Sequence, residues 1–265
     1  MIQLEGVWKS YQGQPALRGV TLTVGRGDAL LLTGPSGAGK STLLRLVFAA
    51  EEADRGELFV AGRNLARLSR ASIPYVRRNI GVVFQDFKLL PSQTALENVA
   101  VALEILGLPG PQIRERSLIS LDKVGLLHKA HARAATLSGG EQQRVAVARA
   151  IVGEPAILLC DEPTGNLDPE RSRSLLELLE EIHLRGTTIL IATHDPQLVD
   201  FGVEAGWRCG RLVDGELLDV SDVSLRPAIS SSRPARLDEE TEGFASRRDA
   251  DATQHHKRLL RVVPR

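Results

Sequence analysis

A glycine-rich stretch that ends in a lysine and a serine is the segment of the chain best suited to bind phosphate. Residues 34–41 read Gly-Pro-Ser-Gly-Ala-Gly-Lys-Ser and follow a short apolar run, Ala29–Thr33. Glycines let the backbone turn so that successive N–H groups face one anion, and the helix expected next adds its positive end. The Lys40 ammonium would reach the outer phosphates of a nucleotide, and the Ser41 hydroxyl would bind Mg²⁺. The alternative is a glycine-rich turn with an incidental lysine. The predicted nucleotide-binding residues here are Gly34, Pro35, Ser36, Gly37, Ala38, Gly39, Lys40, Ser41 and Thr42.

Two consecutive carboxylates follow a second apolar run, Ile157–Cys160. Because acids are costly inside a buried strand, Asp161 and Glu162 must lie at its exposed end, where open parallel sheets bind ligands. Asp161 would then bind Mg²⁺, usually through water, and Glu162 would orient or deprotonate the attacking water. Taken alone, the pair could equally be turn carboxylates before Pro163. The phosphate-binding loop favours the chemical interpretation.

The remaining elements predict an α/β fold with a mostly parallel sheet. Alternating Val and Thr residues predict strands in the first 25 positions, and residues 56–64 predict a hairpin that turns near Ala61-Gly62. Short apolar runs predict further strands at residues 80–84 and 188–192, and helices are expected at 43–50 and 171–183. Between about residues 92 and 150 helical spacing replaces strand patterns, which indicates a helical insertion. Gly202 and Gly206 argue against a long helix after His194.

A third motif, Leu137–Arg144, contains the capping-box pair Ser138 and Glu141 and two glycines at the start of a predicted helix. The order Lys40, Gln85, Ser138, Asp161, His194 resembles the ATP-binding cassette (ABC) ATPases over nearly all of residues 2–219. The resemblance implies a P-loop NTPase fold with an N-terminal antiparallel β subdomain and a helical subdomain at about 86–155. The ABC domain would span residues 1–220, and its substrate would be ATP with Mg²⁺.

The resemblance also assigns roles to residues outside the loop. Tyr11 would stack on adenine, although it could be an ordinary surface tyrosine. Gln85 would contact Mg²⁺ and water, and His194 would contact the γ-phosphate. Asp168, in Asn166-Leu167-Asp168, would lie at a dimer interface. In this family two cassettes pack head to tail, so Ser138, Gly139 and Gly140 would contact the γ-phosphate that the other subunit's Lys40 holds. This implies a homodimer or a pair with a second ATPase.

Residues 73–100 narrow the resemblance to the FtsE family of bacterial cell-division ATPases, through Ile73–Arg78, Ile80–Pro91 and Glu97–Ala100. That family implies a polytopic membrane partner, FtsX, which passes the ATPase cycle to cell-wall hydrolases, and a peripheral location on the cytoplasmic face of the inner membrane. The apolar residues after Gln85 would then form an exposed interface patch or simply pack in the helical insertion: Phe87, Leu89, Leu90 and Pro91. Three alternatives remain. They are an ATPase of a lipoprotein-releasing or MacB-type transporter, a soluble ABC ATPase that acts on nucleic acid, and a P-loop nucleotide kinase.

Composition excludes several other classes. Lys plus Arg and Asp plus Glu are 33 each, so the net charge is zero and a general nucleic-acid binder is not expected. The two cysteines form no CxxC pair, which argues against a disulfide scaffold or a structural zinc site. The longest run without a charged residue is eleven positions, too short to span a membrane, and no signal peptide is expected at the N-terminus. Residues 221–265 are expected to form a disordered charged tail.

Overall fold

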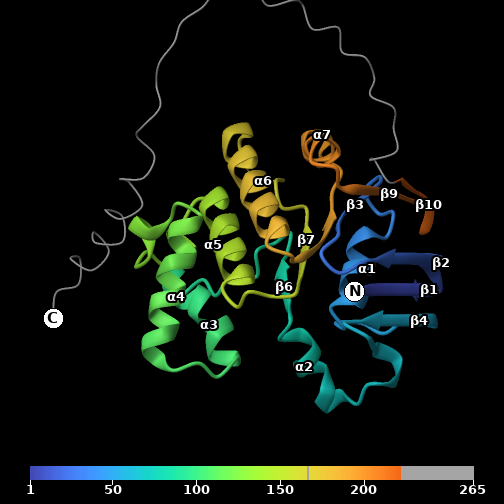
Figure 1. Cartoon of the computed structure of the whole chain (residues 1–265), viewed down its shortest axis with the longest axis horizontal. Helices are drawn as coiled ribbons and strands as arrows, with labels where there is room; N and C mark the ends of the chain where they lie inside the picture. The colour runs from blue at the N-terminus through green and yellow to red at the C-terminus, as the bar shows by residue number, and fades with distance from the viewer. Residues whose placement is uncertain (166, 222–265) are drawn as a thin grey trace, which may run out of the picture. The chain divides into compact units, whose positions relative to one another are not determined.

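The computed structural model describes residues 1–165 and 167–221 of the chain (Figure 1). Residues 222–265, which make up nearly all of the predicted tail, lie outside the described residues, as does Asn166. No helix in the described ranges is long and apolar enough to cross a membrane.

A six-stranded sheet carries the phosphate-binding loop, the Asp161-Glu162 pair and His194 at or just after the carboxyl ends of its strands. Four of its parallel strands, at residues 29–33, 80–83, 157–161 and 188–192, consist almost entirely of apolar residues because both faces of the sheet are covered there. The predicted strands at 29–33 and 188–192 are confirmed with those bounds, and the other two shift by one residue at one end. The strand order is β10 (Glu216–Ser221), β9 (Arg208–Val213), β3 (Ala29–Thr33), β8 (Thr188–Ala192), β7 (Ile157–Asp161) and β6 (Ile80–Val83), with only β10 antiparallel to its neighbour among these described strands.

A second, antiparallel sheet forms the predicted N-terminal β subdomain. Strand β2 alternates between buried and exposed residues, as expected of a strand with one solvent-exposed face. Its buried residues include Val20, Leu22 and Val24, and Thr21 and Thr23 between them are exposed. The hairpin turns at Ala61 and Gly62, which both have positive φ, as a two-residue type I′ turn requires. The strand order is β2 (Gln14–Val24), β1 (Ile2–Tyr11), β4 (Arg55–Val60) and β5 (Arg63–Asn64).

Helix α1 (Lys40–Val47) lies between the two sheets (Figure 1). Its apolar residues pack in one core with the antiparallel sheet and with Leu30 and Leu32 of β3. Leu31, between them, points to the opposite face and joins a second core formed with the remaining helices. The helix begins at Lys40 rather than at the predicted Leu43, because the glycine-rich loop continues directly into its first turn.

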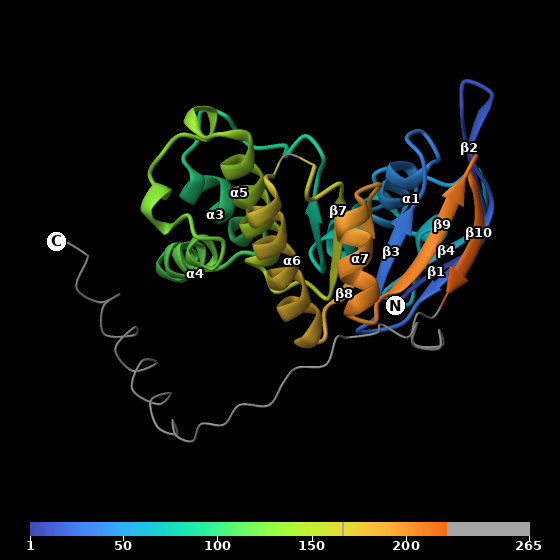
Figure 2. The ribbon, with the colours of Figure 1, turned by 90° about the horizontal axis from the view of Figure 1, so that it is seen from above.

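Helices cover the other face of the parallel sheet and extend beyond it. Helices α3 (Ala95–Ile105), α4 (Gly110–Lys123) and α5 (Gly139–Ile151) pack against one another within the predicted helical subdomain. Capping boxes at Thr94 and Ser138 start α3 and α5, the second as predicted. Figure 2 shows α6 (Pro169–Leu184) and α7 (Pro196–Glu204) along the sheet.

Helix α7 runs through Gly202, which the sequence expectation treated as a helix breaker. A Cβ at Gly202 would lie 2.5 Å from Leu31 Cδ1, so the glycine lets the helix approach β3 closely. The helix is nine residues long, and Gly206, with φ 76°, lies just after its end. Helix α7 is therefore short, as predicted, but Gly202 allows close packing and does not end the helix.

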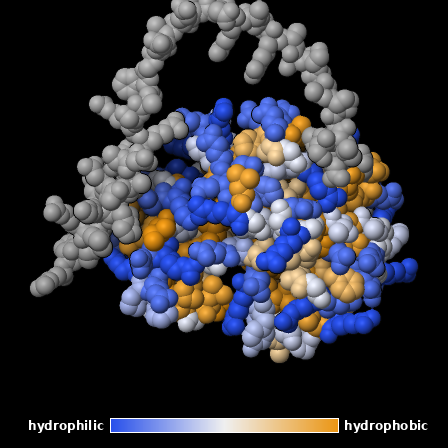
Figure 3. All heavy atoms as spheres, viewed as in Figure 1, coloured by the Kyte–Doolittle hydropathy of each residue, from blue (hydrophilic) through white to orange (hydrophobic). Residues whose placement is uncertain are grey.

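A groove of about 480 Å³ lies between α2 (Ile73–Arg77) and β6 on one side and helices α3 and α5 on the other. Most of its lining residues are apolar, among them Phe84, Ala102 and Ile105, and Ile105 is 62% exposed. Arg77 and Arg78 also line it. Figure 3 shows apolar atoms over α3 beside a hollow on this face.

Candidate nucleotide-binding site

The loop between β3 and α1 has positive φ at three positions, a conformation that glycine adopts at the least cost. Gly34, Gly37 and Gly39 have φ values of 142°, 79° and 103°. A Cβ at Gly34 would lie 2.0 Å from Leu212 O, and one at Gly39 would lie 2.3 Å from Ala16 O. Two of the glycines therefore seat the loop against neighbouring strands. Gly37 is exposed, and a Cβ there would meet no atom within 4 Å.

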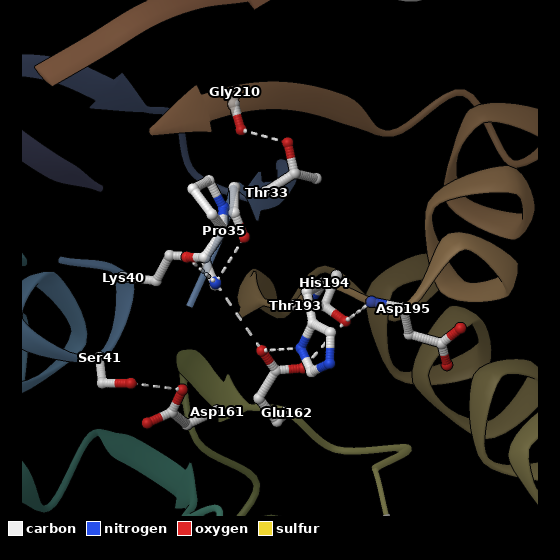
Figure 4. Close-up of polar contacts among 11 residues, drawn as sticks. Thr33, Pro35, Lys40, Ser41, Asp161, Glu162, Thr193, His194, Asp195 and Gly210 are labelled. Carbon is white, nitrogen blue, oxygen red and sulfur yellow. Dashed lines mark hydrogen bonds and ion pairs between the residues drawn. The ribbon is translucent and has the colours of Figure 1, made fainter. Parts of the chain in front are cut away.

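The start of α1 presents backbone N–H groups and one ammonium group. Gly39 precedes the helix without a side-chain cap, and the first turn holds no acidic residue. Lys40 is 6% exposed, and its Nζ donates to Gly34 O at 2.8 Å and to Pro35 O at 3.1 Å (Figure 4). Since an uncapped helix N-terminus and a lysine both attract anions, the donor set of this loop fits a phosphate chain.

Ser41 and Asp161 meet beside the loop. Ser41 Oγ donates to Asp161 Oδ1 at 3.0 Å (Figure 4). Burial, and in addition the nearby charge of Glu162, raises the pKa of Asp161, although the Ser41 hydrogen bond opposes the shift. A hydroxyl and a carboxylate are oxygen ligands of the kind that Mg²⁺ prefers, so these two side chains fit that ion.

Glu162 comes directly after β7 and turns toward the same site. Its Oε1 lies 3.9 Å from Lys40 Nζ and 2.7 Å from His194 Nδ1. Its Oε2 accepts from the His194 backbone N–H at 3.2 Å (Figure 4). Glu162 lies beyond the end of β7, where the sequence placed it, and the carboxyl ends of β3, β7 and β8 bring these residues to one edge of the sheet.

Three polar residues in this region were not singled out from the sequence. Thr193 Oγ1 donates to Glu162 Oε2 at 3.3 Å and accepts from the Asp195 backbone N–H at 3.0 Å. Thr164 Oγ1 donates to Asp195 Oδ2 at 2.7 Å. Their position in the sequence could have identified them as site residues, because each lies within two residues of Glu162 or His194 at the end of a buried strand.

The remaining predicted site residues lie apart from this cluster. Ser138 caps α5 through Glu141, and Asp168 caps α6 and pairs with Arg171 at 2.9 Å. Gln85 is exposed beyond the end of β6, the strand beside β7. Among the described residues, no hydrogen bond or ion pair joins Gln85, Ser138, Gly139, Gly140 or Asp168 to Lys40, Ser41, Asp161 or Glu162.

Tyr11 ends β1 close to the first turn of α1. Its ring is 39% exposed, and its hydroxyl hydrogen-bonds Glu51. Partial burial, followed by that hydrogen bond, raises the pKa of Tyr11, although a hydrogen bond with Thr42 of α1 opposes the shift. The exposed ring beside the phosphate-binding loop is compatible with a stacked base.

Comparison with known proteins agrees with this geometry. Residues 17–165 match the family model described as "ABC transporter". The cell division ATP-binding protein FtsE of Streptococcus pneumoniae is 50% identical over 201 residues, 76% of this chain and 87% of that protein. FtsE of Escherichia coli is 48% identical over 218 residues, 82% of this chain and 97% of that protein.

Solved structures show the same fold. A dimeric structure of MJ0796, titled a bacterial ABC transporter cassette, has a TM-score of 0.79 and 36% identity over 84% of this chain and 99% of that chain. A second MJ0796 dimer, in a post-hydrolysis state bound to ADP and Pi, has the same TM-score. The chain is an ATPase that belongs to the ABC transporter family, in its branch of FtsE cell division ATP-binding proteins.

Proposed function

We propose that this ATPase powers a cell-division complex at the inner membrane, with Glu162 as the base that activates water. The observation that carries the catalytic part is the position of Glu162 Oε1, between Lys40 Nζ at 3.9 Å and His194 Nδ1 at 2.7 Å. A carboxylate between the ammonium that would bind the outer phosphates and a histidine lies where a water could attack the γ-phosphate.

The other residues of the site would bind the phosphates, the Mg²⁺ ion and the adenine of the nucleotide. The loop 34–42 would hold the phosphates, with Lys40 exchanging the carbonyls of Gly34 and Pro35 for phosphate oxygens. Ser41, Asp161 and Gln85 would hold Mg²⁺, directly or through water, and the ion would neutralise charge that develops on the phosphates. Tyr11 would stack on the adenine, and His194 would contact the γ-phosphate.

We infer that two cassettes close over ATP. Ser138, Gly139 and Gly140 make no contact with the chain's own Lys40 among the described residues, although the start of α5 carries two glycines that expose N–H groups. A second copy would supply these residues, with Asp168 at the same interface. The dimeric MJ0796 structures support this arrangement for a protein with the same fold.

The groove between α2 and α3 is the proposed docking site of a polytopic, FtsX-like membrane subunit. It lies beside the segment after Gln85, where Arg149 Nη1 and Nη2 bond the carbonyls of Lys88 and Phe87 at 2.7 and 2.6 Å. A movement of Gln85 in the site could therefore reach the groove through this segment. The attachment would place the ATPase on the cytoplasmic face of the membrane, where the subunit would signal to cell-wall hydrolases.

The names of the relatives favour cell division over the transport alternatives. The relatives at 48–50% identity in three bacteria share the name cell division ATP-binding protein. A lipoprotein-releasing or MacB-type role would use the same catalytic residues and would differ only in the partner. The balanced charge of the chain gives no support to a nucleic-acid substrate.

Substitution of Glu162 tests the catalytic proposal. Glu162→Gln should bind ATP and Mg²⁺ but lose turnover, so ATP-bound dimers should accumulate in size-exclusion chromatography with light scattering. Glu177→Gln, on the exposed face of α6, is the matched control and should hydrolyse ATP normally. Wild-type turnover by Glu162→Gln would refute the role of the base.

Substitution in the groove tests the membrane partner. Ile105→Asp places a charge at the groove, and Ile119→Asp places the same change on α4, where Ile119 is 45% exposed and lies outside the groove. The Ile105→Asp variant should no longer co-purify with a polytopic membrane protein, whereas the Ile119→Asp variant should. Both variants should hydrolyse ATP at the wild-type rate. Equal retention by both variants would contradict docking in the groove.

A further inference from the structure

The two oxygens of the Glu162 carboxylate have different surroundings. Oε1 faces Lys40 Nζ and the His194 ring. Oε2 accepts from Thr193 Oγ1 at 3.3 Å and from the His194 backbone N–H at 3.2 Å (Figure 4). Oε2 is therefore bonded to Thr193 and to the backbone after β8, whereas Oε1 lies between the His194 ring and Lys40 of the phosphate-binding loop.

The Thr193 hydroxyl is itself fixed in direction. Thr193 is 0% exposed, and its Oγ1 accepts from the Asp195 backbone N–H at 3.0 Å. A hydroxyl has a single proton. Because the Asp195 N–H is a donor, that proton is available to Glu162 Oε2. A hydrogen bond to an ionised acceptor is stronger than one between neutral groups, so this bond can hold a carboxylate in one rotamer.

Asp195 is held in turn by the segment that carries Glu162. Its Oδ2 accepts from Thr164 Oγ1 at 2.7 Å, and its Oδ1 accepts from the Gln197 N–H at 2.9 Å, which caps α7. Thr164 is buried and lies two residues after Glu162. The hydrogen bonds thus run from Thr164 through Asp195 and Thr193 back to Glu162, and they connect the ends of β7 and β8.

The backbone of Glu162 needs such support. Its φ is 50°, in the left-handed region that costs a non-glycine residue free energy. Its N–H donates to Ala192 O at 2.9 Å, which joins the same two strand ends. A strained residue keeps its conformation only where several contacts define it, and the Thr193 bond is one of them.

We propose that Thr193 is a positioning residue for ATP hydrolysis. Its hydroxyl, oriented by Asp195 and Thr164, fixes Oε2 of Glu162 so that Oε1 faces the phosphate-binding loop and accepts the proton of the attacking water. This inference rests on the proposed function of Glu162 as the general base. Thr193 touches neither ATP nor water in this scheme, so it acts on the rate of hydrolysis and not on nucleotide affinity.

Thr193→Val tests the inference in the full-length chain, because valine has nearly the shape of threonine and lacks the hydroxyl. Steady-state hydrolysis should show kcat lower by about tenfold, the loss expected for one hydrogen bond to a charged group, with KM and the dissociation constant for ATP unchanged. Thr193→Ser keeps the oxygen and should restore most of kcat. Thr164→Val, which acts through Asp195, should lower kcat by less.

A matched control is available in β8, the strand that precedes Thr193. Thr188 is also 0% exposed, and its Oγ1 accepts from the Gly27 N–H at 2.9 Å at the end of β8 remote from the site. Thr188→Val should lower the unfolding temperature and leave kcat unchanged. An equal loss of kcat in Thr188→Val and Thr193→Val would show that loss of a buried hydroxyl acts through stability, and it would overturn the proposal.

The Glu162→Gln background separates this inference from the proposed function. If Glu162→Gln alone retains wild-type turnover, the general-base role fails, and the positioning role fails with it. If Glu162→Gln loses turnover but Thr193→Val does not, only the positioning role is overturned. If both lose turnover, the double variant should be no slower than Glu162→Gln. A further loss in the double variant would show that Thr193 acts elsewhere.

Discussion

Two glycines of the phosphate-binding loop offer a matched pair for measuring how the loop is seated. Gly37 and Gly39 both have positive φ, but a Cβ at Gly37 meets open space, whereas one at Gly39 would lie 2.3 Å from Ala16 O and 2.9 Å from Leu17 Cδ2. Non-bonded contacts of a Cβ essentially never fall below 3.0 Å, so Gly39→Ala forces the loop and β2 apart.

The expected costs follow from these contacts. At Gly37 an alanine in the left-handed region lowers the free energy of unfolding by about 1–2 kcal/mol. The lower conformational entropy of the unfolded alanine variant offsets about 0.4–1 kcal/mol of this loss. At Gly39 overpacking adds about 1–3 kcal/mol to the same strain, and the backbone carbonyl of Ala16 is less free to yield than a side chain. We therefore expect Gly39→Ala to be less stable than Gly37→Ala by about 2 kcal/mol, or about 4–8 °C in unfolding temperature for a chain of this size.

Thermal unfolding of the two variants without nucleotide, followed by circular dichroism, measures this difference directly. Both variants carry an alanine at positive φ, so the comparison offsets the strain that is common to the two positions. The additional loss at Gly39 reports its contact with β2 and its larger φ of 103°. Equal unfolding temperatures would refute the argument that Gly39 is required for packing, and they would leave only its φ to explain the glycine.

Three further outcomes are expected. Lys40→Ala should remove ATP binding measurable by calorimetry while the fold persists; retained affinity would contradict the phosphate-binding assignment. Asp161→Asn should raise the unfolding temperature in EDTA near pH 7, because burial raises the pKa of Asp161 and its charged form destabilises the fold. That gain in unfolding temperature should shrink as the pH falls toward about 4. Over this range the wild-type Asp161 carboxylate becomes protonated in the folded state at a higher pH than in the unfolded state, so its destabilising charge is lost. A chain cut after Ser221, the last residue of β10, should unfold at the wild-type temperature, because the composition of the segment beyond it is typical of a disordered tail; a clear drop would show that the tail packs on the domain.

The sequence predicted the elements whose signals are local. Continuous apolar runs placed β3 and β8 with their exact bounds, and the alternation from Val20 to Val24 placed β2 with one exposed face. The capping pair of Ser138 and Glu141 marked the start of α5. Each of these signals depends on residues within one turn or one strand, where burial and backbone hydrogen bonding leave few alternatives.

Long-range contacts were harder to predict. Gly202 resembled a helix breaker in the sequence. The structure shows that a glycine is needed there because of the close contact with Leu31, which lies 171 positions away in the chain. Thr193 and Thr164 were missed because hydroxyl residues are common at strand ends. Only the packing of β7 beside β8 shows that Thr193 bonds Glu162 and that Thr164 bonds Asp195, which in turn bonds Thr193. The motif residues were found because they lie at fixed spacing in short segments.

The φ of Glu162 explains how two consecutive carboxylates serve one site. In an extended strand neighbouring side chains point to opposite faces, so Asp161 and Glu162 would diverge if β7 simply continued. The left-handed turn at Glu162 breaks the alternation, and Asp161 then bonds Ser41 while Glu162 reaches Lys40 and His194. A residue type that adopts this conformation more readily, such as Asn or Gly, would remove the carboxylate. The fold therefore keeps a strained glutamate where the proposed chemistry needs one. Its backbone N–H donates to Ala192 O, and its carboxylate accepts from Thr193 and His194, and these hydrogen bonds hold it in place.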